Sequence, residues 1–210
     1  MKKIIGLGGV ARAGKDTFAA ILEKNIVQSG KSVLKIALAS PLKQHCDGFL
    51  KENLGISAYT SDPNEKLLIR PMLVWYGDVQ RKRTNGRYWI DLAKKSIQET
   101  NYDYYIITDV RYDAYEKDEL YFLKNEVSGT LCHISKYKLT RTQDGSSISI
   151  QKEFVKPANE HETKNDPKIR AGADHVVEWA DEGNMSELEL LYNPTLNEHV
   201  NQFIEKFKLI

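Results

Sequence analysis

The chain has 210 residues, in which 30 lysine and arginine side chains almost balance 29 aspartate and glutamate side chains. This balance gives no basic field for duplex nucleic acid, and the length is enough to bury a substantial core. The two cysteines, Cys46 and Cys132, lack the spacing of a zinc site or a disulfide framework. We therefore expect a protein of a reducing cytoplasm that neither crosses a membrane nor binds nucleic acid.

The N-terminal segment predicts a phosphate-binding loop between a strand over 3–8 and a helix over 15–28. The segment Gly9-Val-Ala-Arg-Ala-Gly-Lys15 has the spacing G-x-x-x-x-G-K. Glycines let successive N–H groups point at phosphate oxygens, the lysine reaches the β- and γ-phosphates, and the following helix start favours an anion. We assign ATP binding to Gly9, Arg12, Ala13, Gly14, Lys15, Asp16 and Thr17.

The residue after the loop lysine also bears on metal binding. Most loops of this type have Ser or Thr there, whose hydroxyl binds Mg²⁺, whereas this chain has Asp16 followed by Thr17. Carboxylate and hydroxyl oxygens both suit Mg²⁺. We expect Mg²⁺ at this position, and the sequence leaves open which of the two side chains contacts it.

Strand and helix signals then alternate, which favours an α/β fold around a mostly parallel sheet. Residues 40–100 read as a helical substrate-binding region, in which Ser40 caps the first helix and Pro71 kinks or restarts the second. The elements expected here are a strand over 32–38, a helix over 40–54, a loop over 56–64, and helices over 65–81 and 88–99.

The second half of the chain contains a break in this alternation. Residues 137–165 read as a lid-like insertion, because Asp144-Gly145 between two alternating stretches is a hairpin signal. Around it we expect strands over 104–108, 130–136 and 174–179, and helices over 113–125 and 194–208. We interpret residues 1–210 as a single domain.

Asp109 and Arg111 follow directly after the most apolar strand, at the edge where open α/β sheets bind their ligands. In an enzyme with a phosphate-binding loop, an acid there orients the attacking group or holds Mg²⁺. We predict catalytic roles for Lys15, Asp109 and Arg111. For Arg111, a surface ion pair with the nearby acidic residues is an equally good interpretation.

A dense group of basic and aromatic residues marks a second phosphate site. Arginine matches phosphate oxygens with two parallel hydrogen bonds, so a phosphorylated acceptor is a natural partner. Our candidates for acceptor binding are Lys43, Arg70, Trp75, Arg81, Arg83 and Arg87, with Lys82 as an alternative to its neighbours. In the insertion, Lys138, Arg141, His161 and Glu162 are the candidate lid residues.

Three segments together resemble the bacteriophage deoxynucleoside monophosphate kinases, which have the fold of the P-loop NTPases. They are Gly9–Thr17 with its Lys-Asp pair, Ala39-Ser-Pro-Leu-Lys43, and Tyr105-Ile-Ile-Thr-Asp-Val-Arg111. The stretch Trp75-Tyr-Gly-Asp78 is similar to the family's Leu-Gly-Thr-Asp segment. The resemblance implies transfer of the ATP γ-phosphate to a deoxynucleotide 5′-phosphate in the host cytoplasm, with Asp109 as the catalytic or metal-linked acid.

Two other interpretations stay open. A kinase of another phosphorylated metabolite, such as phosphomevalonate, also shows Gly-Lys-Asp together with Asp-x-Arg. A regulatory or assembly ATPase would use the same loop but leaves the basic cluster at 81–87 unexplained. The sequence does not decide the accepted base, the sugar or the oligomeric state, for which a homodimer is one option.

Overall fold

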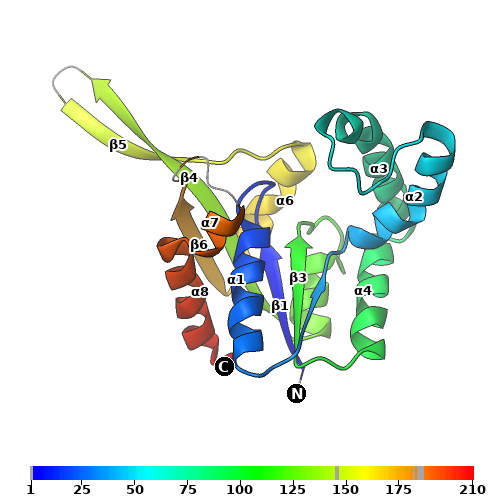
Figure 1. Cartoon of the computed structure of the whole chain (residues 1–210), viewed down its shortest axis with the longest axis horizontal. Helices are drawn as coiled ribbons and strands as arrows, with labels where there is room; N and C mark the ends of the chain where they lie inside the picture. Colours follow the sequence, from blue (N-terminus) through cyan, green and yellow to red (C-terminus); the bar gives the residue numbers. More distant parts are fainter. Residues whose placement is uncertain (1, 145–146, 182, 184–186) are drawn as a thin grey trace.

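The computed structural model describes residues 2–144, 147–181, 183 and 187–210. Within these ranges, six strands form a sheet flanked by helices on both faces (Figure 1). The strands β2, β3, β1, β4 and β6 pair in that order and run parallel, whereas β5 pairs antiparallel with the outer part of β4. The expected α/β fold with a mostly parallel sheet is confirmed.

Most expected elements are present to within two residues of their predicted ends. In chain order the elements are β1 (Lys3–Gly8), α1 (Lys15–Gln28), β2 (Val33–Ile36), α2 (Ser40–Leu54), α3 (Pro63–Arg83), α4 (Arg87–Glu99), β3 (Tyr104–Val110), α5 (Glu119–Tyr121), the π-helical turn η1 (Phe122–Glu126), β4 (Thr130–Asp144), β5 (Ser147–Phe154), α6 (Glu160–Ala171), β6 (His175–Ala180), α7 (Glu187–Leu191) and α8 (Pro194–Phe207).

Two apolar layers hold the helices on the sheet. Ile5 and Leu7 of β1 point to one face and pack with Phe18 of α1 and Phe203 of α8. Ile4 points to the other face, where α4, η1 and α6 supply the partners. Because successive side chains of a strand alternate between faces, the short apolar run of β1 serves both layers.

The helices α2, α3 and α4 form the region expected for substrate binding, and α2 and α3 share a small core of their own. Two predictions in this region are wrong in detail. Ala39, not Ser40, is the N-cap of α2 and makes no side-chain cap. The helix α3 runs through Pro71 without a restart, so only the kink expected at this proline stays a prediction; Asp62 caps the start of the helix.

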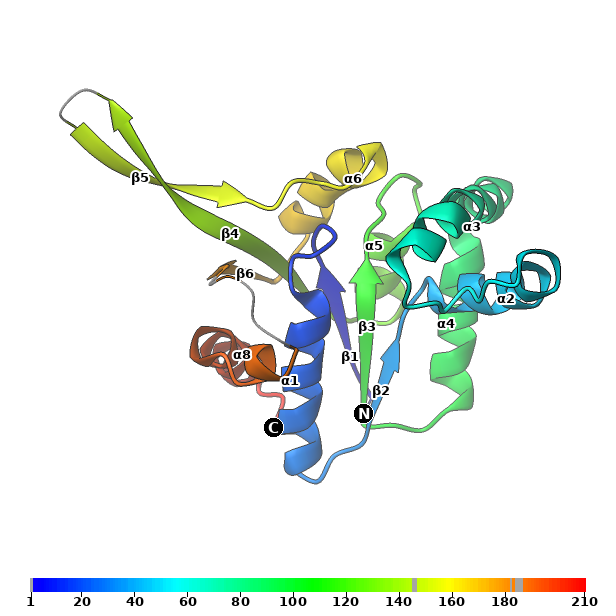
Figure 2. The same cartoon turned by 45° about the horizontal axis from the view of Figure 1, so that its top comes forward.

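The segment after β3 also differs from the expectation. Residues 113–125 are not one helix: a loop precedes the short α5, which continues into η1. The strand expected over 130–136 extends to Asp144 and pairs with β5 in a long ribbon that projects from the body (Figures 1 and 2). The hairpin is present, while Gly145 of its expected turn lies outside the described residues.

The insertion contains a helix that the sequence did not suggest. Asn159 caps α6 by accepting a hydrogen bond from the Glu162 amide at 3.0 Å. The buried face of α6 carries Glu162 and Asn165 beside Ile169, so it lacks the apolar stripe that marks a helix. Across the described ranges, no helix combines the length and apolar character needed to cross a membrane.

Candidate active site

The loop between β1 and α1 curls tightly because two glycines occupy positions that no other residue fits. Gly9 has φ +130°, and a Cβ there would lie 2.2 Å from the carbonyl oxygen of Ile134. Gly14 has φ +93°, and a Cβ there would lie 2.5 Å from the indole of Trp179. That indole is buried and donates from Nε1 to the Ala13 carbonyl at 2.8 Å, so Trp179 packs against the loop and holds it through this hydrogen bond.

Lys15 is buried at the start of α1. Its Nζ atom donates to the carbonyls of Gly9 and Val10, both at 2.7 Å, so the lysine folds back along its own loop. Burial, together with the nearby positive charge of Arg111, lowers the pKa of Lys15 to about 8. An anion bound at the loop would stabilise the charged form of this lysine.

A cavity of about 550 Å³ opens at the loop. Lys15, Asp16 and Thr17 line it together with Asp109. The oxygens of Asp16, Thr17 and Asp109 fit Mg²⁺, which is usually held by one or two carboxylates together with phosphate oxygens and water. When bound, the metal would offset charge on the β- and γ-phosphates. Arg12, Gly14, Lys43 and Lys136 also line this donor cavity.

Asp109 stands at the end of β3 and holds the neighbouring strand-to-helix connection. Its carboxylate accepts hydrogen bonds from the amides of Leu38 at 2.6 Å and Ala39 at 3.1 Å. These bonds fix the connection between β2 and α2 beside the site. Burial raises the pKa of Asp109, while the two amides and the nearby cations favour its charged form.

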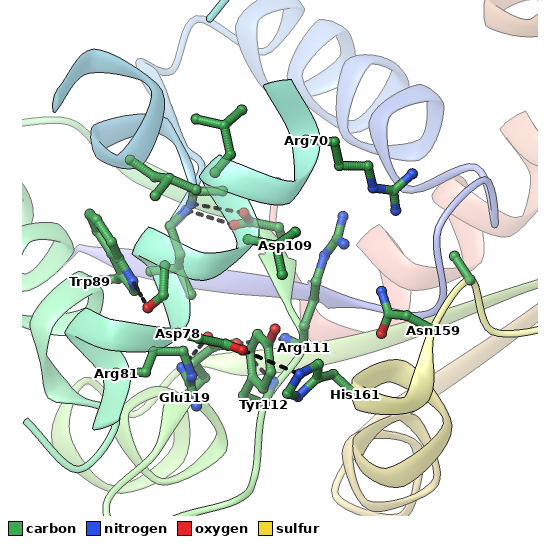
Figure 3. Close-up of a pocket in the computed structure, with 17 residues that line it drawn as sticks. Arg70, Asp78, Arg81, Trp89, Asp109, Arg111, Tyr112, Glu119, Asn159 and His161 are labelled. Atoms are coloured by element: carbon green, nitrogen blue, oxygen red, sulfur yellow. Dashed lines mark hydrogen bonds and ion pairs between the residues drawn. The ribbon is translucent and has the colours of Figure 1, made fainter. Parts of the chain in front are cut away.

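A second cavity, of about 470 Å³, lies on the other side of Asp109 (Figure 3). Its walls are mixed in character. Apolar side chains line it together with charged and hydrogen-bonding groups. The apolar residues include Leu38, Leu42, Leu73, Val74 and Trp89; the polar ones are Arg70, Asp78, Arg81, Asp109, Arg111, Tyr112, Glu119, Asn159 and His161.

Asp109 and Arg111 line both cavities, so they form the boundary between them. The Arg111 guanidinium contacts Glu162 at 3.2 Å, and its Nε atom is buried with no hydrogen-bond partner among the described residues. Its main-chain amide donates to Glu119 at 2.6 Å. A buried N–H without a partner is uncommon, and here a phosphate oxygen at the boundary would satisfy it.

Arg81 also faces the second cavity, but its charge is already compensated. The guanidinium donates to Asp118 at 2.7 Å and to Glu119 at 3.1 Å, and it stacks on the ring of Tyr112 at 3.8 Å. All three side chains are at most 7 % exposed. Burial raises the pKa of Glu119 to about 8, despite the opposing influence of Arg81. Arg81 is therefore part of a neutralised internal network rather than a free cation.

Several residues predicted to bind the acceptor do not line the second cavity. Arg87 pairs with Glu126 at 2.7 Å and with Asp91 at 2.8 Å. Trp75 is 64 % exposed and, like the exposed Arg83, belongs to neither lining. Lys43 lines the donor cavity instead of the acceptor side.

The two halves of the expected lid separate in the structure. Lys138 and Arg141 lie on the β4–β5 ribbon, outside both cavities. His161 and Glu162 lie in the first turn of α6 and do reach the site: His161 contacts Asp78 at 3.4 Å across the second cavity (Figure 3). Glu162 contacts the phosphate-binding loop through the Ala11 amide.

Sequence reasoning missed the residues that act through contacts with distant segments. Glu119, Asn159 and Trp179 were not expected at the site. The pattern Asn159-x-x-Glu162 is a helix-start signal that would have revealed α6. Nothing local marks Trp179 as the support of a loop 166 positions away in the chain.

The sequence profile of phosphomevalonate kinases matches residues 7–128, which include the loop, Asp109 and Arg111. The chain belongs to the phosphomevalonate kinase family. It is therefore a P-loop kinase, as the loop and the Asp-x-Arg pair predicted. The match agrees with the alternative acceptor considered above, while the resemblance to deoxynucleoside monophosphate kinases stays a prediction.

Two solved structures of shikimate kinases are also similar to this member of the phosphomevalonate kinase family. The enzyme from Acinetobacter baumannii in complex with shikimate is 14 % identical, with a TM-score of 0.44, and the alignment covers 100 % of this chain and 97 % of that one. The enzyme from Aquifex aeolicus is 15 % identical, with a TM-score of 0.36, over 95 % and 98 % of the two chains. The search of curated proteins gave no match.

Proposed function

We propose that this kinase transfers the γ-phosphate of ATP to the phosphate group of a small, already phosphorylated acceptor. The observation that carries the proposal is the boundary formed by Asp109 and Arg111, which line the donor and acceptor cavities at once. A group bound at the loop and a group bound beside α3 would meet there. Catalysis then consists of holding the two phosphates in line and offsetting their charge with Lys15, Arg111 and Mg²⁺.

Phosphomevalonate is the acceptor that the family match favours. The apolar side chains of the second cavity suit its branched carbon chain, and two arginines of the lining face its anionic groups. These are Arg70 and Arg111. Arg81 is buried in its pairs with Asp118 and Glu119, whereas Arg111 contacts Glu162 but keeps an Nε atom without a partner among the described residues. Arg111 would bind the acceptor phosphate at the boundary, and Arg70 would bind an anionic group from the α3 side.

A deoxynucleoside monophosphate is the second candidate. It is supported by the sequence resemblance and by the hydrogen-bonding groups of Asp78, Asn159 and His161, which can read the edge of a base. The stacking partner expected for the base, Trp75, does not line the cavity. The two candidates therefore differ in which part of the cavity wall they would use.

Release of ADP in a coupled assay separates these acceptors. The full chain with saturating MgATP is supplied with phosphomevalonate, with each deoxynucleoside monophosphate, or with no acceptor. One acceptor class is expected to raise turnover about tenfold or more above the acceptor-free rate. An equal rate with and without every acceptor would contradict the kinase proposal and favour a regulatory ATPase.

Two arginines of α3 provide a matched pair for the acceptor site. Arg70 lines the cavity, whereas Arg83 is exposed outside it. Loss of a charge-assisted hydrogen bond should make Arg70→Ala raise the acceptor KM by about tenfold or more and leave the ATP KM unchanged. Arg83→Ala should change neither constant. Similar effects of both substitutions would show that the cavity is not the acceptor site.

A further inference from the structure

Glu162 places a buried carboxylate at the mouth of the phosphate-binding loop. The side chain is 7 % exposed. Both oxygens lie 3.2 Å from the Ala11 amide, one accepts from the Ala158 amide at 2.9 Å, and the other contacts Arg111 at 3.2 Å. Figure 2 shows α6, which carries Glu162, beside the loop between β1 and α1.

The Ala11 and Arg111 donors are of the kind that a terminal phosphate group requires. Loop amides and arginine side chains are the standard ligands of phosphate oxygens, and Arg111 stands where the donor and acceptor cavities meet. A carboxylate and a phosphate are both anions. Two anions within about 4 Å repel each other strongly in a partly buried site, so they cannot share these donors without cost.

The contacts of Glu162 go beyond the needs of its own helix. Asn159 already caps α6 through the Glu162 amide. The carboxylate instead reaches a main-chain amide 151 positions away in the chain. A side chain needed only for helix stability would not have to extend into the phosphate-binding loop.

We propose that Glu162 is a positioning residue that stands in for the terminal phosphate of ATP and is displaced when that phosphate binds. The inference rests on the proposed use of ATP. ADP ends one phosphate earlier, so it leaves Glu162 in contact with Ala11 and Arg111. Glu162 therefore weakens ATP binding selectively, and it holds Arg111 at the boundary between successive turnovers.

Calorimetric titration of the full chain with MgADP and with a nonhydrolysable ATP analogue tests this role. Glu162→Gln keeps an oxygen acceptor for the amides but removes the charge. We expect it to lower the Kd of the analogue about tenfold, or about 1.4 kcal/mol, and to leave the Kd of ADP within about twofold. Glu160→Gln, on the same turn with a side chain that is 89 % exposed, should change neither value.

A second measurement uses the unmodified chain, so its result does not depend on whether the Glu162→Gln variant folds correctly. Hydrogen exchange at the Ala158 amide should accelerate with the analogue, because that amide loses its acceptor, and should stay slow with ADP. Equal exchange with both nucleotides, or an equal change in both affinities in Glu162→Gln, would overturn the role of Glu162 alone. If the unmodified chain bound neither nucleotide, the proposed kinase function would fail with it.

Discussion

Replacing Arg81 by Met should destabilise the protein strongly, because it leaves two carboxyl groups buried without their cation. Asp118 and Glu119 are 0 % and 4 % exposed, and Arg81 is 7 % exposed. Breaking a buried ion pair by removing one partner typically costs about 3–5 kcal/mol. At a urea m-value of about 2 kcal/mol/M, a loss of about 4 kcal/mol lowers the unfolding midpoint by about 2 M.

The pH dependence of this loss identifies its electrostatic origin. The pKa of Glu119 is already raised to about 8 in the native chain, and removal of Arg81 raises it further. A carboxyl whose folded pKa exceeds its unfolded value contributes stability at low pH that is lost as the pH rises through the folded pKa. At pH 5, Glu119 carries a proton in both proteins. The difference in stability should therefore be larger at pH 9 than at pH 5.

Urea denaturation at both pH values, followed by circular dichroism, measures the effect. Arg87→Met is the control, since Arg87 pairs with Glu126 and Asp91 at a more exposed place and should lose about 1 kcal/mol or less. A midpoint for Arg81→Met that falls by no more than the control, or by the same amount at pH 5 and pH 9, would refute the reasoning.

Three further outcomes are expected at the loop and its boundary. Because the pKa of Lys15 is lowered to about 8, this lysine loses its positive charge as the pH rises through 8. The Kd for ATP should therefore increase between pH 7 and pH 9.5. The variant Lys15→Arg stays charged over this range and should lack the increase. Asp109→Asn should lower turnover much more than ATP affinity, and a near-normal kcat would remove Asp109 from catalysis. Gly14→Ala places a methyl group against Trp179 and should weaken ATP binding by about tenfold or more. Gly30 also has a positive φ, of +81°, but has open space around it. Gly30→Ala should therefore leave ATP binding unchanged and lower the free energy of unfolding by only about 1 kcal/mol.

The sequence predicts well where local pattern determines structure. The loop, the strands β1 and β3 and the helices α1 and α8 follow from apolar periodicity and glycine spacing, which act over a few residues. The helix α6 escapes prediction because its buried face carries Glu162 and Asn165, whose partners lie in other segments. Polar burial of this kind leaves no periodic apolar signal.

Roles that depend on distant partners were the hardest to predict. The basic character of Arg81 suggested a phosphate ligand, but Asp118 and Glu119, which lie 37 and 38 positions away in the chain, already accept the hydrogen bonds of its guanidinium. Trp75 suggested a stacking surface, yet the turn of α3 on which it lies directs it to solvent. Residue type alone indicates what a side chain can do, and only the fold determines which neighbour it meets.

The shared wall between the two cavities has a practical consequence for inhibitor design. Because Asp109 and Arg111 belong to both linings, a bivalent molecule with one part in each cavity would pass beside these two residues. An adenosine polyphosphate tethered to an acceptor fragment would gain from the high effective concentration of its second half. The tether length that gives the tightest binding would then measure the distance between the two bound parts, and so the distance over which the phosphoryl group is transferred.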